Sequence, residues 1–138
     1  MVDGIKMKLK LIPKEDLRDF WKIQRQYLEK HTFDYVKRDY SKNKNLYVGC
    51  YKGQELIGIA HGFVREKEVI LSGIAVKYEY WKKGIGKKLL RFFEKQVKKL
   101  KIKKISTGAA KNVVKFYARS GYKPVKEKPR FVVMEKEI

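Results

Sequence analysis

The chain has 138 residues, of which 43% are hydrophobic and 13% aromatic, and this composition excludes a disordered protein and predicts a single folded domain over residues 1–138. A net charge of +20 at pH 7 favours nucleic acid, anionic membranes or phosphorylated ligands as partners, although such a surface is also typical of proteins from heat-loving organisms. The chain has one cysteine, Cys50, which excludes an intramolecular disulfide, and we expect no metal site. No apolar run is long enough for a signal peptide or a membrane span. We therefore expect a cytoplasmic protein without a membrane partner.

The N-terminal third is predicted to form a strand followed by helical segments. Apolar residues alternate with lysine over residues 6–12, which is the period of a strand. From Leu17 apolar residues recur with helical spacing to about His31, and this stripe contains one glutamine, Gln24. Residues 32–45 fit either a second short helix or a loop that packs over a groove.

An antiparallel meander of three strands is predicted next, at residues 46–51, 55–65 and 69–76. A short connection then leads through Gly84-Ile85-Gly86 into a long amphipathic helix that runs to Leu100. A strand at 103–107 follows, so the strand, the helix and the next strand make a right-handed crossover between parallel strands.

The C-terminal part is predicted to complete the sheet. Asn112 can cap a short helix over residues 113–120, which Gly121 ends. Residues 124–128 fit a turn or an irregular hairpin arm, and residues 131–138 form the last strand.

The strand, glycine turn and helix around residue 84 suggest a seat for a pyrophosphate. The first N–H groups of a helix have no intrahelical partner, and they carry the positive end of the helix dipole. Glycine lets a phosphate approach these groups without meeting a Cβ. Four lysines flank the turn, namely Lys82, Lys83, Lys87 and Lys88.

Two blocks of the sequence resemble motifs of the GNAT superfamily of N-acetyltransferases. Residues 76–90 (VKYEYWKKGIGKKLL) are similar to its acetyl-coenzyme A binding motif, and residues 112–122 (NVVKFYARSGY) are similar to a second block. The resemblance implies an α/β (α+β) fold: a mixed, mostly antiparallel sheet of six to seven strands, helices on both faces, and one crossover carrying the pyrophosphate turn. It further implies a monomer or homodimer that transfers the acetyl group of acetyl-coenzyme A directly to an amine, which is a protein N-terminus, a lysine, a polyamine or a small molecule.

The resemblance also assigns roles to particular residues. Tyr117 would be the general acid that protonates the departing thiolate. Residues 74–76 would bind the pantetheine arm through their backbone, and residues 82–87 would surround the pyrophosphate. The full set of implied cofactor-binding residues is Ile74, Ala75, Val76, Lys82, Lys83, Gly84, Ile85, Gly86, Lys87, Asn112 and Phe116. The chain departs from the family pattern at Trp81, where Gln or Arg is usual, and at Ala110, where the family often has asparagine.

The sequence leaves the general base and the acceptor site open. His61, Glu68 and a water chain ending on backbone carbonyls are candidate bases, whereas Glu79 is expected to be exposed, and Ser72 is the only hydroxyl on its strand. Cys50 is expected to be a small buried side chain rather than a nucleophile, because direct transfer needs none. The walls of the acceptor site are expected to come from Trp21, Phe33, Tyr35 and Tyr40.

Two alternatives stay open as well. The first is a basic module that binds nucleic acid without sequence preference on an acetyltransferase-like scaffold, through the patch Lys98, Lys99, Lys101, Lys103 and Lys104. The second is an acyl donor other than acetyl, such as a propionyl or succinyl thioester.

Overall fold

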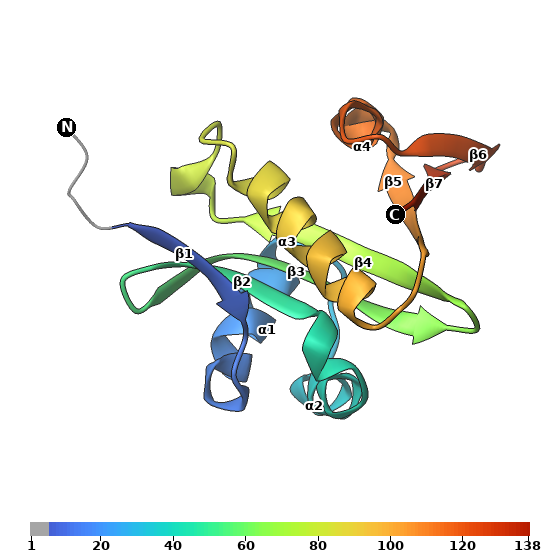
Figure 1. The fold of residues 1–138 in the computed structure, drawn as a ribbon. Coiled ribbons are helices and arrows are strands. Elements are labelled where there is room, and N and C mark those ends of the chain that lie inside the picture. The colour runs from blue at the N-terminus through green and yellow to red at the C-terminus, as the bar shows by residue number, and fades with distance from the viewer. Residues whose placement is uncertain (1–5) are drawn as a thin grey trace.

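The structure, a computed structural model, describes residues 6–138 (Figure 1). Residues 1–5 belong to the N-terminal segment in which no signal peptide is expected, and they lie outside the described residues. A seven-stranded sheet has the order β1-β2-β3-β4-β5-β7-β6. Its strands are β1 (Met7–Leu11), β2 (Tyr47–Lys52), β3 (Glu55–Arg65), β4 (Glu68–Val76), β5 (Lys104–Ala110), β6 (Lys123–Glu127) and β7 (Phe131–Glu137).

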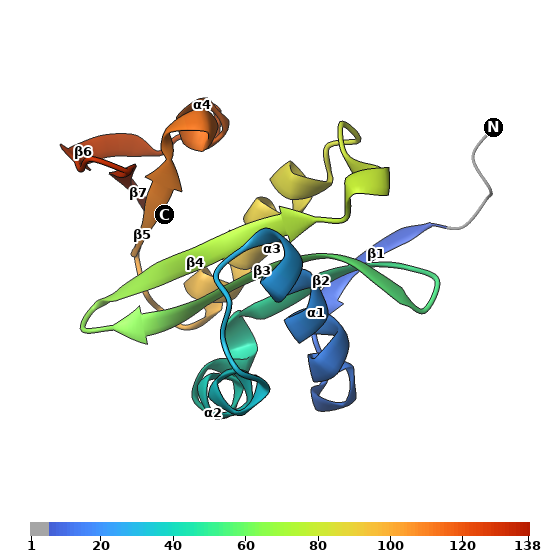
Figure 2. The ribbon, with the colours of Figure 1, turned by 180° about the vertical axis from the view of Figure 1, so that it is seen from behind.

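Helices cover both faces of this sheet, as predicted (Figures 1 and 2). On one face lie α1 (Leu17–Tyr27) and α2 (Phe33–Asn43), and on the other lie α3 (Ile85–Lys99) and α4 (Val114–Arg119). The apolar stripe of α3, with Leu89, Phe93 and Val97, is fully buried in one core cluster, and Phe20 of α1 is fully buried in the other. The predicted mixed sheet with helices on both faces is therefore confirmed.

Several boundaries differ from the prediction. Helix α1 ends at Tyr27 rather than near His31, because Leu28 turns into an extended conformation, and its side chain lies against Gly73 of β4. Residues 33–43 form a helix, which Thr32 caps by accepting a hydrogen bond from the Tyr35 N–H at 3.1 Å.

The C-terminal part differs in three places. Residues 123–127 form an exposed edge strand paired with β7, where a turn or irregular hairpin arm over residues 124–128 is predicted; its lysines and proline suit a sheet edge. Strand β5 extends three residues further than predicted, to Ala110. The cap of α4 is Val113, so the predicted cap at Asn112 is wrong.

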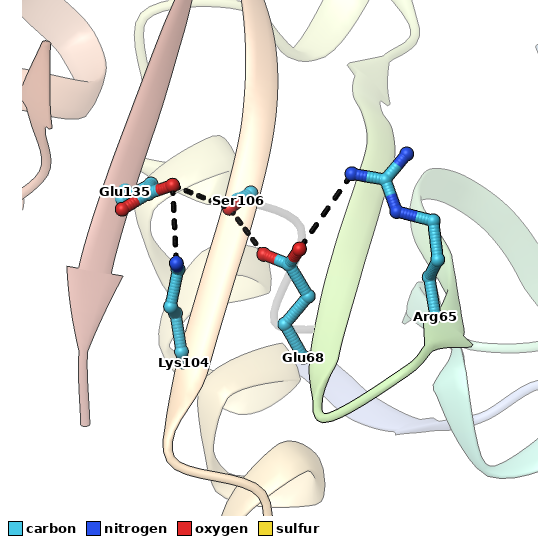
Figure 3. A network of polar contacts seen from close by, with 5 residues as sticks. All are labelled: Arg65, Glu68, Lys104, Ser106 and Glu135. Carbon is cyan, nitrogen blue, oxygen red and sulfur yellow. Dashed lines mark hydrogen bonds and ion pairs between the residues drawn. The ribbon is translucent and has the colours of Figure 1, made fainter. Parts of the chain in front are cut away.

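The only parallel pair in the described sheet is β4 with β5, and it is short. It joins Val69, Ile70 and Leu71 to Ile105, Ser106 and Thr107, after which no pairing of the two strands is found in the described residues. A polar network closes one end of this pair (Figure 3). The Ser106 hydroxyl donates to Glu68 at 2.6 Å, Arg65 pairs with Glu68 at 3.6 Å, and Lys104 pairs with Glu135 at 3.2 Å.

At the other end of the pair, the Thr107 hydroxyl donates to the Leu71 carbonyl at 2.9 Å. Beyond this bond β4 and β5 separate, which leaves one edge of β4 open. In the part of the chain that the structure describes, no helix combines the length and apolarity that crossing a membrane requires.

Candidate functional site

The open edge of β4 is the first component of the site. The Lys77 N–H donates to the Ile57 carbonyl. Hydrogen-bonded and non-hydrogen-bonded pairs alternate along an antiparallel ladder, so the next hydrogen-bonded pair of β4 and β3 is Ala75 with Ile59. The backbone groups of Ile74 and Val76 consequently point away from β3, toward the gap beyond the β4–β5 pair. Ala75 presents its backbone to β3 instead.

A β-bulge lies where the gap begins. The register of β3 with β4 shifts between His61 and Gly62, which face Gly73 and Leu71, so that Ser72 is the extra residue. Bulges are frequent next to active sites because they redirect the strand locally. Here the bulge lies beside the point at which Thr107 bonds Leu71.

The turn before α3 is the second component. Lys82 and Gly84 both have left-handed backbone conformations, with φ of 64° and 77°. For lysine this conformation costs roughly 1 kcal/mol, so the surrounding structure must enforce it. The first intrahelical bond runs from the Lys88 N–H to the Gly84 carbonyl. The three preceding amides, of residues 85–87, therefore lack an intrahelical acceptor, and no described side chain caps the helix.

The turn has room for a ligand. A Cβ added to Gly84 would meet no described atom within 4 Å, and the lysines at 82, 83, 87 and 88 are exposed. Ile85 is buried and anchors the helix, so it can offer a ligand only its backbone. These features suit a diphosphate: amides without an intrahelical acceptor, the positive end of a helix dipole and exposed cations beside an open space.

Trp81 connects the two components. Its indole N–H donates to the Val76 carbonyl at 2.6 Å, so that one outward-facing acceptor of the open edge is already occupied. The side chain that replaces the usual Gln or Arg thus holds the turn against the end of β4. From the opposite face, the Tyr27 hydroxyl accepts from the Tyr78 N–H at 2.9 Å and holds the same connection.

Tyr117 reaches the gap from α4. It is only 5% exposed, and its hydroxyl lies near the Thr107 side chain, at the point where β4 and β5 separate. Burial raises the pKa of Tyr117, and the nearby Thr107 hydroxyl opposes this only in part. The phenol therefore keeps its proton at neutral pH, as a general acid requires.

The neighbours of Tyr117 occupy different positions. The Phe116 ring lies against the first turn of α3, 3.6 Å from the position of a Cβ on Gly86. Asn112 is exposed in the short turn over Lys111–Val113. The structure thus brings Phe116 to the helix terminus, and it places Asn112 at the surface.

A cavity of about 420 Å³ lies on the face that carries α1 and α2, and it reaches the same gap. It is bounded by Leu71 and Ser72 of β4, by Gly108 and Ala110 of β5, and by residues of both helices. Tyr35, one of the residues expected to form the acceptor site, lines it. Trp21 and Phe33 line a different hollow on the outer side of the α1–α2 loop, and the Tyr40 hydroxyl instead donates to the Ile12 carbonyl at 2.8 Å.

The candidate bases are now separated by position. His61 lines the cavity and is 7% exposed, and desolvation lowers its pKa to about 3, with His31 adding to the effect. Glu68 lies at the closed end of the β4–β5 pair, bound to Ser106 and Arg65. Glu79 is exposed.

Cys50 is fully buried, and burial raises the pKa of its thiol, which agrees with a packing role. Among residues 6–138 no three His, Cys, Asp or Glu side chains gather as a metal site requires.

Sequence reasoning missed two residues of this region. Thr107 was only the end of a predicted strand, and nothing in the sequence signals that it joins β4 to β5 and contacts Tyr117. Gln24 lines the cavity from α1 and is 2% exposed. A glutamine within an apolar helical stripe was the available signal for it.

Comparison with known families and structures agrees with this geometry. The sequence model of the acetyltransferase (GNAT) family matches residues 13–122 of this chain. Comparison with curated proteins found no match.

Solved structures share the fold at low identity. Ard1 from Thermoplasma volcanium has a TM-score of 0.86 at 12% identity, covering 96% of this chain and 97% of that one. Naa50 from Arabidopsis thaliana, in complex with the bisubstrate analogue CoA-Ac-MVNAL, has a TM-score of 0.80 at 15% identity, over 97% and 100%. PaiA N-acetyltransferase from Thermoplasma acidophilum, in complex with coenzyme A, has a TM-score of 0.74 at 20% identity, over 97% and 100%. The chain belongs to the GNAT family of acetyl-coenzyme A dependent N-acetyltransferases.

Proposed function

We propose that residues 1–138 form one transferase domain that moves the acetyl group of acetyl-coenzyme A directly to an amine. The observation that carries this proposal is the separation of β4 from β5 after Leu71 and Thr107. It leaves an unpaired strand edge that leads, over a few residues, to the open N-terminus of α3. A ligand with an amide-bearing arm that ends in a diphosphate fits this arrangement of backbone groups, from the strand edge to the helix terminus.

The binding step uses the backbone of two elements. Ile74 and Val76 offer outward-facing groups to the pantetheine arm, of which the Val76 carbonyl is taken by Trp81. The amides of residues 85–87 and the left-handed turn at Lys82 and Gly84 hold the diphosphate. Lys82, Lys83 and Lys87 add positive charge, which attracts a phosphorylated ligand over long range.

The chemical step needs a positioned amine and a proton for the leaving group. When bound, acetyl-coenzyme A supplies a thioester that an amine can attack. The chain holds the two reactants on opposite faces of the sheet, with the diphosphate beside α3 and the amine in the cavity under α1 and α2. As the C–N bond forms and the C–S bond breaks, Tyr117 donates its proton to the departing sulfur from a position near Thr107 at the gap. The proton that the amine nitrogen loses passes to water, and the phenolate regains a proton from water.

The variety of the solved relatives supports an amine acceptor without favouring one kind. They include a ribosomal-protein-S18-alanine N-acetyltransferase, an aminoglycoside 6'-N-acetyltransferase and a complex with a peptide bisubstrate analogue. A chain with a charge of +20 repels polycationic acceptors, so that protein N-termini and small amines are favoured over polyamines.

Thermal melting with coenzyme A tests the binding step. At a hundredfold excess over Kd, a ligand bound only by the folded protein adds about 2.7 kcal/mol to its stability. We expect Lys82→Ala to weaken this effect and Lys98→Ala, which removes the same charge near the other end of α3, to leave it unchanged. No rise in melting temperature with coenzyme A contradicts the proposal. Equal weakening by both variants shows attraction by net charge alone.

A further inference from the structure

Two buried polar atoms have no hydrogen-bond partner in the described part of the chain, and both belong to residues that line the cavity under α1 and α2. They are Oε1 of Gln24 and Nδ1 of His61. Unpartnered buried polar atoms are rare, and each costs about 1–3 kcal/mol of stability. A cavity that keeps two of them beside an opening is therefore incomplete without a polar occupant.

The two residues come from facing elements. Gln24 lies one turn after Phe20 on α1, and the Phe20 ring meets the His61 ring edge-on, with centroids 5.0 Å apart. His61 lies on β3 opposite Gly73 of β4, next to the bulge. The amide torsion of a glutamine is broad, so its carbonyl can turn toward an occupant without a strained rotamer.

The other polar groups of the cavity are already engaged or exposed. The carboxylate of Asp39 accepts from the Tyr47 hydroxyl and from the Asn43 amide. Glu29 pairs with His31 at 3.4 Å, and its side chain is 83% exposed. Arg130 is also exposed, at the rim. The deep polar positions with spare hydrogen-bonding capacity are thus Gln24 and His61.

We propose that Gln24 and His61 form the seat of the acceptor, in which the glutamine carbonyl and one imidazole nitrogen accept the two N–H bonds of a neutral primary amine. This inference rests on the proposed transferase function. Two acceptors match the two N–H donors of an –NH₂ group, and they leave its lone pair free to attack the thioester. An ammonium ion has a third N–H for which these two atoms provide no partner.

The position of the seat agrees with the chemistry. His61 faces Gly73, whose neighbour Ile74 presents its backbone to the gap in which the pantetheine arm is proposed to lie. Burial keeps His61 uncharged at neutral pH, so it acts here as a hydrogen-bond partner that positions the amine and carries no charge that would repel it. A bound water could satisfy the same two atoms, and the experiment must separate these cases.

The experiment compares primary amines with their N-methyl derivatives, which offer one N–H fewer. Thiol release from acetyl-coenzyme A is followed with a tetrapeptide bearing a free α-amine, with Nα-acetyl-lysine amide and with benzylamine, and with the N-methyl form of each. The variants are Gln24→Leu, which removes one acceptor, and Gln96→Leu. The latter is a matched control, because Gln96 is also buried, at 6% exposed, on α3 away from this cavity.

We expect the wild type to prefer the best primary amine over its N-methyl form by at least tenfold in kcat/KM. In Gln24→Leu this preference falls toward one and kcat/KM for the primary amine falls at least tenfold, with KM for acetyl-coenzyme A unchanged. The melting temperature of the free Gln24→Leu protein stays equal or rises, since an unpartnered polar atom is removed. Gln96→Leu keeps the wild-type preference.

Two results overturn the seat. One is an undiminished preference for primary amines in Gln24→Leu. The other is a lower melting temperature with unchanged turnover, which marks a structural water site. If no amine in the set releases thiol with the wild type, and coenzyme A does not raise its melting temperature, the transferase proposal itself fails.

Discussion

The buried histidine of the cavity makes stability depend on pH in a way that one substitution removes. The pKa of His61 is lowered from 6.5 to about 3, because burial disfavours the charged ring. Between these two values the unfolded chain binds a proton at this position and the folded chain does not. Stability contributed by His61 is therefore complete above pH 6.5 and is lost progressively as the pH falls toward 3.

The magnitude follows from the shift. At pH 4.5 the unfolded histidine lies two pH units below its pKa, and the folded one is still neutral. Each unit corresponds to about 1.4 kcal/mol, so His61 alone costs about 3 kcal/mol of stability at pH 4.5 relative to pH 7.5. That is a large part of the 5–15 kcal/mol typical of a folded domain.

Urea unfolding of the wild type and of His61→Phe, at pH 7.5 and at pH 4.5, measures this effect. Phenylalanine keeps a ring beside Phe20 and Tyr47 and cannot titrate. All other ionisable groups are shared, so that the difference between the two proteins isolates His61. We expect the wild type to lose about 3 kcal/mol more than His61→Phe on acidification. Equal losses would refute the reasoning, because they would show a ring that titrates normally in the folded protein.

Three further substitutions test the proton donor, the diphosphate turn and the polar network of the β4–β5 pair. Tyr117→Phe keeps the buried ring, and we expect kcat to fall roughly a hundredfold or more without loss of coenzyme A affinity, because only the proton donor is removed; unchanged kcat would exclude the acid role. Gly84→Ala should cost about 1 kcal/mol in urea unfolding for its left-handed backbone, and it should weaken coenzyme A binding by about tenfold in calorimetry, since its Cβ enters the open space of the turn; wild-type affinity would place the diphosphate elsewhere. Ser106→Ala should lower the unfolding free energy by about 1–3 kcal/mol, because Glu68 loses its hydroxyl donor; a stability equal to the wild type would show that the network of Figure 3 does not hold the β4–β5 pair.

Much of the fold follows from local periodicity. The alternation along β1 and the fourfold spacing along α3 are properties of neighbouring residues, so that the sequence predicts both elements and the turn at Gly84 between strand and helix. Strand β6 was not predicted, because all its residues are exposed and no apolar alternation marks it. The end of α1 was placed too late, because Leu28 leaves the helix to cover Gly73, a contact with a strand 45 residues away.

Some residues of the candidate site can likewise be predicted from local motifs, and others cannot. Tyr117 and the turn before α3 are continuous motifs, and a resemblance to known motifs is enough to single them out. Thr107 and Gln24 matter through contacts between distant elements, which no local pattern contains. The sequence allows His61 to be a base or a packed side chain, and its burial against Phe20 with an unpartnered nitrogen is a property of the assembled structure.

A titration of coenzyme A into the ¹⁵N-labelled protein, followed through the backbone amide resonances, tests directly whether the open edge of β4 and the turn before α3 bind the cofactor. We expect the amides of residues 82–87 to shift most and to saturate, together with those of Ile74 and Val76. Saturable binding that leaves these amides unchanged, or that shifts chiefly the lysine-rich end of α3 near Lys98, would contradict this expectation.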